Sequence, residues 1–155
     1  DEIQQIYADK AEIFMSISRT NPMPFAKEVL TALQAAGKKI VLVTGSGQKS
    51  LISRLNESYP GVFSPENMVT SFDVKYGKPN PEPYLMALQK AGVRPNEAVV
   101  IENAPLGVQA GVEAEIFTIA LNTGILNDDV LSSAGANVVL PSMQTLYDHL
   151  SSLLR

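Results

Sequence analysis

Lys78 stands in a stiff piece of backbone, between Gly77 and prolines at positions 79, 81 and 83. Each proline fixes its own φ and biases the residue before it away from the helical region. The segment therefore holds a lysine on an extended stretch just before a predicted helix. A cation held in one place suits the neutralisation of a bound anion. We interpret Lys78 as a candidate anion-binding residue, with an ordinary solvated lysine as the alternative.

A second candidate follows the apolar segment 39–43, where residues 44–47 (Thr-Gly-Ser-Gly) lead straight into a predicted helix. Hydroxyls and glycine-exposed backbone N–H groups at a helix N-terminus make a good anion site. A turn with an N-cap serine explains the same residues, so this stretch alone leaves both interpretations open. Nucleotide fingerprints fit less well. A dinucleotide motif needs glycine where Ser50 stands, and Gln48 interrupts the Walker pattern.

Glu102 and Asn103 end another apolar segment, at 97–101. A carboxylate at the end of a buried strand is unfavourable unless a cation or hydrogen bonds compensate it. Oxygen ligands of this kind suit a hard ion such as Mg²⁺. The alternative is that Glu102 caps the following helix while Asn103 lies in a turn. If this pair, Lys78 and residues 44–47 converge in one crevice, they supply the metal, cation and donors that phosphoryl transfer needs.

The elements that must position these residues alternate along the chain. Helices are predicted at residues 25–37, 48–59, 81–92, 105–114 and 143–154, and strands at 39–45, 67–71, 97–103, 116–122 and 137–141. Continuous Val/Ile/Leu runs between helices are typical of a parallel sheet covered on both faces. An amphipathic helix at 1–18 comes first. We therefore predict a doubly wound, Rossmann-like α/β fold, in which ligands bind at the carboxyl ends of the strands.

The composition fits one globular domain, with 155 residues that are 45% hydrophobic and 18% charged. The formal net charge is −4 and the Lys and Arg residues are scattered, which argues against nucleic acid or an anionic membrane as the main partner. Cysteine is absent, which excludes a disulfide framework, a thiolate zinc site and a cysteine nucleophile. Without a membrane-spanning apolar run or a signal-peptide pattern, we expect a cytoplasmic protein of undetermined oligomeric state.

Three stretches together resemble the haloacid dehalogenase-like superfamily, and within it the β-phosphoglucomutase-like phosphatases and mutases. "VLVTGSG" is similar to the family's second motif, "KYGKPNPEPY" to the third and "VVIENAPLGVQAG" to the fourth. The resemblance implies one role for each motif: phosphate binding at Thr44, Gly45 and Ser46, positioning of phosphate and nucleophile at Lys78, and Mg²⁺ binding at Glu102 and Asn103. Thr44 and Lys78 are thereby implied to take part in catalysis.

The resemblance also implies a domain organisation. Residues 1–20 would end a helical cap, and residues 21–155 would form the core. Family members form an aspartyl-phosphate on an Asp-x-Asp motif of the first core strand, which lies between the strands ending at Thr44 and Glu102. That spacing occurs nowhere in this sequence. We therefore expect this chain, which opens at Asp1 within the cap pattern, to be the C-terminal part of a longer protein and to be inactive alone.

The expected function of the intact protein is Mg²⁺-dependent phosphoryl transfer. It would hydrolyse or relocate the phosphoryl group of a small metabolite such as a sugar phosphate, and the sequence leaves phosphatase and mutase open because the cap selects the substrate. Asn103 stands where the family usually has aspartate, which removes one negative charge from the implied metal site. A non-catalytic phosphate-binding or interaction domain is the alternative, and Asn103 and the missing motif both favour it.

Other polar residues are weaker candidates. His149 is the only histidine and is interpreted as a surface residue of the last helix. Asp128 and Asp129 are interpreted as the solvated start of a helix and Tyr76 as a packing residue, while Asp73 is a possible extra carboxylate in the crevice.

Overall fold

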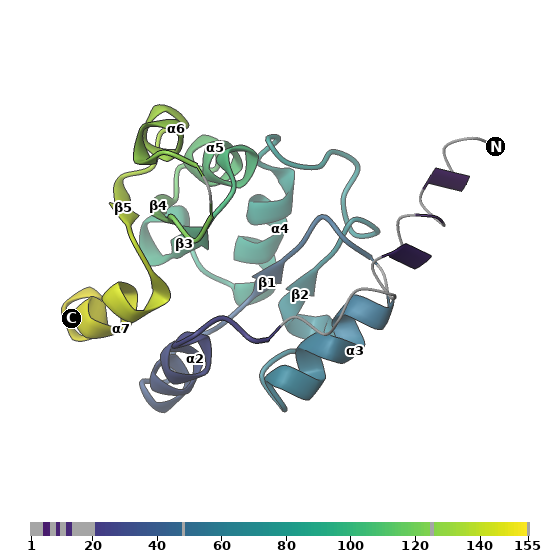
Figure 1. The fold of residues 1–155 in the computed structure, drawn as a ribbon, viewed down its shortest axis with the longest axis horizontal. Coiled ribbons are helices and arrows are strands. Elements are labelled where there is room, and N and C mark those ends of the chain that lie inside the picture. The colour runs from purple at the N-terminus through teal and green to yellow at the C-terminus, as the bar shows by residue number, and fades with distance from the viewer. Residues whose placement is uncertain are drawn as a thin grey trace.

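The structure is a computed structural model that describes residues 5, 6, 9, 12, 13, 21–47, 49–124 and 126–154 (Figure 1). The helix expected at 1–18 lies mostly outside these residues. Every helix in the described part of the chain is too short or too polar to span a membrane.

Helices and strands alternate from residue 26 onward, as the sequence predicts. The helices are α2 (Ala26–Ala35), α3 (Lys49–Ser58), α4 (Glu82–Ala91), α5 (Pro105–Glu113), α6 (Asp128–Ser133) and α7 (Met143–Leu153), with short 3₁₀ turns η1 (Pro65–Asn67) and η2 (Pro95–Glu97). The strands are β1 (Leu42–Val43), β2 (Met68–Val69), β3 (Val99–Glu102), β4 (Phe117–Leu121) and β5 (Val138–Leu140). Helix α4 is capped at its C-terminal end by Gly92, whose φ of 63° is the left-handed conformation that glycine adopts without strain.

The larger sheet has the order β3–β4–β5, and all its strands are parallel. Its register places Glu102 beside Ala120 and Leu121 beside Leu140, so the carboxyl ends of the strands meet at one edge. Polar residues that follow these strands therefore gather on the same side of the molecule, as expected for ligand sites in such sheets.

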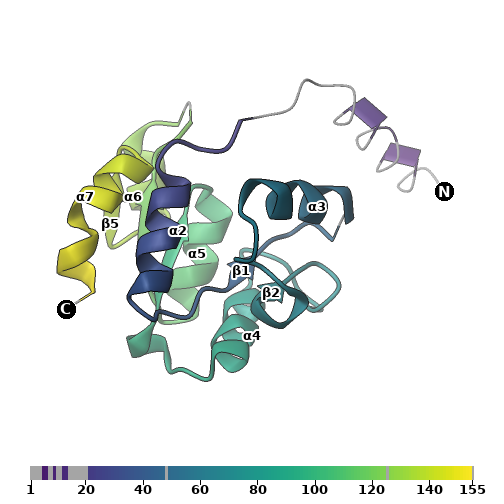
Figure 2. The same cartoon turned by 90° about the horizontal axis from the view of Figure 1, so that it is seen from below.

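Helices cover both faces of this sheet, which accounts for the long apolar runs of its strands (Figures 1 and 2). On one face, Ile119 and Leu121 of β4 pack with residues of α2 and α7. On the other face, Ala120 packs against α5 and α6, where Val108 and Leu131 are fully buried. The alternation of strand residues between two cores confirms the doubly wound arrangement.

The described strands form two sheets. β1 pairs with β2 in parallel, and neither pairs with β3 among the described residues. Helix α4 contacts both β1 and β2, and its Tyr84 and Leu88 pack in one core with Val100 of β3. Hence α4 links the two sheets and lies close to the ends of β1 and β3, where the candidate residues were predicted (Figure 1).

The boundaries of the elements differ modestly from the prediction. The strands are shorter than their apolar runs, because those runs continue into the loops and turns that flank each strand. Helix α6 begins at Asp128, in agreement with the interpretation of Asp128 and Asp129 as a helix start.

Candidate active site

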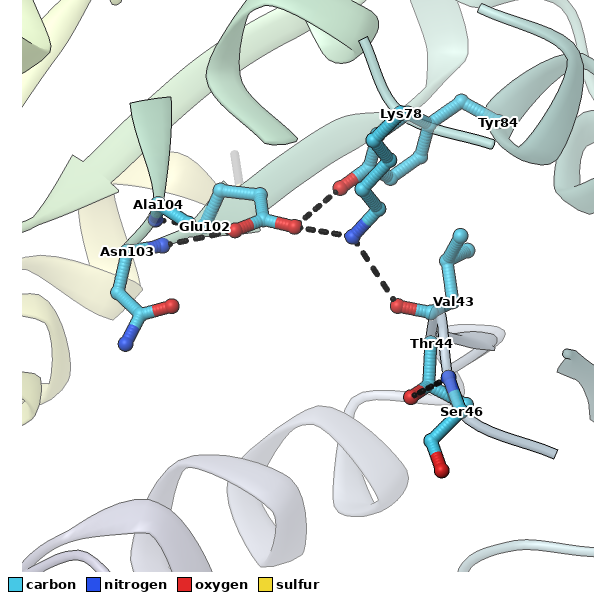
Figure 3. A network of polar contacts seen from close by, with 8 residues as sticks. All are labelled: Val43, Thr44, Ser46, Lys78, Tyr84, Glu102, Asn103 and Ala104. Carbon is cyan, nitrogen blue, oxygen red and sulfur yellow. Dashed lines mark hydrogen bonds and ion pairs between the residues drawn. The ribbon is translucent and has the colours of Figure 1, made fainter. Parts of the chain in front are cut away.

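Three separate segments bring the predicted residues to the carboxyl ends of β1 and β3. Thr44 directly follows β1, and its backbone N–H donates to the carbonyl of Val69 at 2.9 Å. Glu102 is the last residue of β3. Lys78 lies in the loop before α4, and its ammonium reaches between the two strand ends (Figure 3).

Lys78 bridges the two sheets. Its Nζ donates to the carbonyl oxygen of Val43 at 3.3 Å and forms an ion pair with Oε1 of Glu102 (Figure 3). The side chains of Lys78 and Glu102 are only 19% and 10% exposed, so water screens this pair weakly. In the described part of the chain these two oxygens are the hydrogen-bond acceptors of the ammonium, which has three N–H groups.

The carboxylate of Glu102 receives hydrogen bonds on both of its oxygens. Oε1 accepts from Lys78 and from the hydroxyl of Tyr84, the latter at 2.8 Å. Oε2 accepts the backbone N–H groups of Asn103 at 2.9 Å and Ala104 at 3.2 Å, two residues that precede α5, and no side chain of the described residues caps the start of that helix. Burial acts to raise the pKa of Glu102, but the bonds and charge of Lys78, with Tyr84 and the Asn103 N–H, hold that pKa below its ordinary value. The group is therefore a fixed negative charge at neutral pH.

A small cavity of about 120 Å³ opens beside Lys78. It is lined by Thr44, Gly45, Ser71, Val74, Lys75, Gly77, Lys78 and Pro83. A cation, a hydroxyl and a glycine backbone therefore meet at one concave place, as the sequence predicted for Lys78, Thr44 and Gly45. Such a combination suits a small anion.

Ser46 takes a different position from the other members of the predicted anion site. It does not line this cavity, and its backbone N–H donates to Oγ1 of Thr44 at 3.1 Å. A hydroxyl that accepts one hydrogen bond can still donate its own proton, so Thr44 can serve as a donor to a ligand. In this structure Ser46 therefore orients Thr44, and Thr44 and Gly45 form the wall of the cavity.

Asn103 lies on the side of Glu102 away from Lys78 (Figure 3). It is exposed, and its Nδ2 donates to the hydroxyl of Thr123 at 3.3 Å. The amide oxygen of Asn103 and the carboxylate of Glu102 are ligands of the type that Mg²⁺ prefers. The described residues contain no group of three His, Cys, Asp or Glu side chains that could hold a metal. The pair fits Mg²⁺ in ligand type, and completion of the coordination requires oxygens from a phosphate, water or another segment.

Three of the weaker candidates make local hydrogen bonds that stabilise a helix or a turn. Nδ1 of His149, which is exposed, lies 2.8 Å from the carbonyl oxygen of Thr145 in the same helix. Asp128 accepts a hydrogen bond from Nδ2 of Asn122 at 2.6 Å. Asp73 accepts hydrogen bonds from the N–H and hydroxyl of Thr70, both at 2.7 Å, and so fixes the turn after β2. None of the three lines the cavity beside Lys78.

Tyr84 and Ser71 are site residues that sequence reasoning missed. Tyr84 is 6% exposed and occupies an apolar position of α4, so a helical pattern presents it as a core residue. The signal that could have found it is its place six residues after Lys78, within the same stiff segment that leads into the helix. Ser71 follows β2 and lies at a strand end like the other candidates.

The chain is similar to known hydrolases and phosphatases. The haloacid dehalogenase-like hydrolase family model matches residues 1–115. Hexitol phosphatase A of Escherichia coli K12 is 38% identical over 100 residues, which cover 64% of this chain and 45% of that protein. A phosphorylated carbohydrates phosphatase of Thermotoga maritima is 33% identical over 138 residues, which cover 86% of this chain and 61% of that protein.

The chain is also similar to solved structures of hydrolases and of a putative phosphoglucomutase. One described as "Putative beta-phosphoglucomutase from Bacteroides vulgatus" is 55% identical with a TM-score of 0.92, and the match covers 98% of this chain and 61% of that one. A HAD family hydrolase from Deinococcus radiodurans, solved with bound phosphate and sodium, is 28% identical with a TM-score of 0.76 and coverages of 85% and 60%. The chain thus spans less than two thirds of each of these four proteins.

Proposed function

Because this chain belongs to the haloacid dehalogenase-like hydrolase family, we propose that it forms the phosphate-binding part of an enzyme that transfers phosphoryl groups of small metabolites. The observation that carries the proposal is the cavity where Lys78, Thr44 and Gly45 meet at the ends of two parallel strands. Relatives that act on hexitol phosphates and phosphorylated carbohydrates support a sugar phosphate or related compound as the substrate.

Three residues of the cavity have distinct roles in this proposal. Lys78 directs its remaining N–H at a phosphate oxygen, while its bonds to Glu102 and Val43 keep the ammonium in place. The hydroxyl of Thr44 donates a second hydrogen bond, and the backbone beside Gly45 a third. Donors fixed before the reaction stabilise the charge that the phosphoryl oxygens carry in the transition state. Ser46 contributes by holding the hydroxyl of Thr44.

Glu102 and Asn103 are the residues that would hold Mg²⁺. The ion would neutralise charge on the transferring phosphoryl group and orient it. A carboxylate offers about four lone-pair sites, and Glu102 already accepts four hydrogen bonds. We therefore propose that metal binding displaces one of these donors from Glu102, so that the hydrogen-bond network of the site differs between its metal-free and metal-bound forms.

The nucleophile of the proposed reaction comes from outside these 155 residues. β1 and β3 are unpaired with each other in the described structure, and Val99 and Ile101 of β3 are 48% and 40% exposed. An apolar parallel strand between β1 and β3 would join the two sheets and cover such surface. Its carboxyl end would then lie beside Lys78, which is where an attacking aspartate is needed.

A phosphate-binding domain without catalysis is the second candidate. Asn103 favours it, because a neutral amide at this position attracts Mg²⁺ less strongly than a carboxylate does. Under this alternative the cavity still binds phosphate, and only turnover is lost.

Two measurements test the proposal. First, inorganic phosphate is titrated into the protein and binding is followed by ³¹P NMR, where we expect saturable binding that Lys78→Ala weakens. Second, the complete protein is assayed for hydrolysis of p-nitrophenyl phosphate with and without Mg²⁺. Turnover that depends on Mg²⁺ supports the enzyme, and phosphate binding without turnover supports the second candidate. Absence of phosphate binding would overturn both.

A further inference from the structure

The first turn of α4 makes two sets of contacts with the segment that carries Lys78. The first set belongs to Glu82, the first residue of the helix. Its Oε1 accepts the backbone N–H of Lys75 at 2.9 Å, and its Oε2 accepts the backbone N–H of Tyr76 at 2.7 Å. One carboxylate therefore binds two successive peptide groups and ties the loop before Lys78 to the helix after it.

The second set belongs to Tyr84, two residues further along the helix. Its ring lies under the ammonium of Lys78, with Nζ 5.0 Å from the ring centroid. Its hydroxyl donates to Oε1 of Glu102, the oxygen that also pairs with Lys78 (Figure 3). Tyr84 thus touches both members of the ion pair, and its own burial keeps it in place.

We propose that Glu82 and Tyr84 are positioning residues for Lys78: Glu82 fixes the backbone that carries the lysine, and Tyr84 fixes the ammonium against Glu102. This inference rests on the proposed function only in taking phosphate as the ligand of Lys78. Neither residue needs to touch that ligand, and Glu82 is absent from the lining of the cavity.

The physical reason is the flexibility of lysine. A free lysine side chain samples many rotamers, and a ligand that selects one of them binds more weakly by the corresponding loss of entropy. If the ammonium already points at the cavity, this loss occurs during folding and not during binding. The stiff proline frame limits only the backbone, so the side chain requires contacts of its own, and Tyr84 and Glu102 supply them.

A purely structural role is the competing explanation, since both residues also hold α4 and its preceding loop together. The two explanations differ in what they predict for protein that remains folded. A structural contact affects the melting temperature and leaves the phosphate affinity of folded molecules unchanged. A positioning contact lowers that affinity at a temperature where every variant is folded.

The test compares Glu82→Gln and Tyr84→Phe with matched controls. Glu82→Gln retains the side-chain shape but puts an NH₂ group opposite one of the two backbone N–H groups, so one bond is lost. Glu97→Gln is the control for Glu82→Gln. The carboxylate of Glu97 likewise accepts a backbone N–H, that of Arg94 at 2.9 Å, but it does so in a separate turn, η2. Tyr147→Phe is the control for Tyr84→Phe, since Tyr147 is a partly exposed ring that lies against Phe25.

Phosphate affinity is measured with inorganic phosphate by ³¹P NMR, and folding is checked by circular dichroism at the same temperature. We expect dissociation constants about 3- to 10-fold higher for Glu82→Gln and Tyr84→Phe, in line with the loss of one hydrogen bond each, and unchanged constants for both controls. Affinities equal to that of the parent protein in folded Glu82→Gln and Tyr84→Phe would overturn the inference. If the parent protein itself fails to bind phosphate, the proposed function fails instead.

Discussion

Gly107 lies against the carboxylate of Glu102, so closely that a methyl group on its α carbon would overlap the carboxylate carbon and both oxygens. Gly107 is buried in the first turn of α5, directly after the segment whose N–H groups bind Oε2 of Glu102. The absence of a side chain at position 107 therefore allows the helix to start beside the charged group.

Gly107→Ala is expected to destabilise the protein and to disturb the site. Alanine favours a helix over glycine by about 1 kcal/mol. Overpacking a tight interior typically destabilises by about 1–3 kcal/mol, and here the overlapping group is a carboxylate whose hydrogen bonds would shift. We expect a net loss of up to about 2 kcal/mol in urea denaturation, together with weaker phosphate binding.

The control is Gly124→Ala, because an added methyl group at Gly124 meets no atom within 4 Å. It should leave both stability and phosphate binding close to those of the parent protein. A Gly107→Ala protein as stable as the parent, with unchanged phosphate affinity, would show that Glu102 relocates freely and that its observed hydrogen bonds are unimportant.

Much of the candidate site follows from the sequence, because residues that end parallel strands gather at one edge. This rule places Thr44 and Glu102 near each other although 58 positions separate them. The proline frame then predicts a fixed segment for Lys78. The haloacid dehalogenase-like hydrolase family was also identified correctly from the three motifs, as the match over residues 1–115 confirms.

Tertiary contacts between side chains were outside the reach of sequence patterns. Tyr84 has the spacing of a core residue, and the pattern cannot show that its hydroxyl meets Glu102. The ion pair of Lys78 with Glu102 is another such contact, between residues 24 positions apart. Hydrophobic periodicity reports that a strand is buried and not which strand lies next to it, so the expected strand neighbours came from the family resemblance alone.

Lys78→Ala is expected to lower kcat more than it raises KM in the complete protein with p-nitrophenyl phosphate as substrate. The held ammonium interacts most strongly with the charge distribution of the transition state, so its loss affects the chemical step most. Loss of a group of this kind typically reduces kcat by about 10²–10³-fold. Lys27→Ala, on the exposed side of α2, is the control and should retain full activity. An unchanged kcat in Lys78→Ala would contradict the role assigned to the lysine.

Tyr84 is expected to make the stability of the protein depend on pH in the alkaline range. Burial, and then the negative charge of Glu102, raise the pKa of the Tyr84 hydroxyl far above its ordinary value of 10.0. A hydroxyl whose pKa is higher in the folded than in the unfolded protein stabilises the fold as long as the pH is below the pKa of the unfolded state. This contribution is lost as the pH rises above the pKa of the unfolded state. Above about pH 10, this group lowers the free energy of unfolding by up to about 1.4 kcal/mol per pH unit.

Tyr84→Phe lacks this titration, which urea denaturation at a series of pH values can reveal. At neutral pH the variant should be about 1 kcal/mol less stable than the parent, because one hydrogen bond to Glu102 is lost. The difference should shrink as the pH rises beyond about 10, where the parent loses the stability that depends on the neutral hydroxyl. Tyr147→Phe is the surface control. A stability difference between parent and Tyr84→Phe that stays constant up to pH 11 would contradict this prediction.

Asn103→Asp is expected to strengthen Mg²⁺ binding, since it places a second carboxylate next to Glu102. Mg²⁺ is commonly held by one or two carboxylates, and a charged ligand attracts it more strongly than an amide does. Asn103 is exposed and its bond to Thr123 is long at 3.3 Å, so the exchange should disturb the fold little. The threonine hydroxyl can donate to the new carboxylate in place of the lost amide N–H.

Calorimetric titration with MgCl₂ measures the effect, and we expect a dissociation constant about 10-fold lower for Asn103→Asp, equivalent to about 1.4 kcal/mol. Asn96→Asp is the control, because it adds the same charge at an exposed position of η2. If both variants bind Mg²⁺ equally, net charge and not a local site is responsible. A specific gain at position 103 would instead locate the metal beside Glu102, where each bound ion must compete with the four hydrogen bonds that this carboxylate accepts.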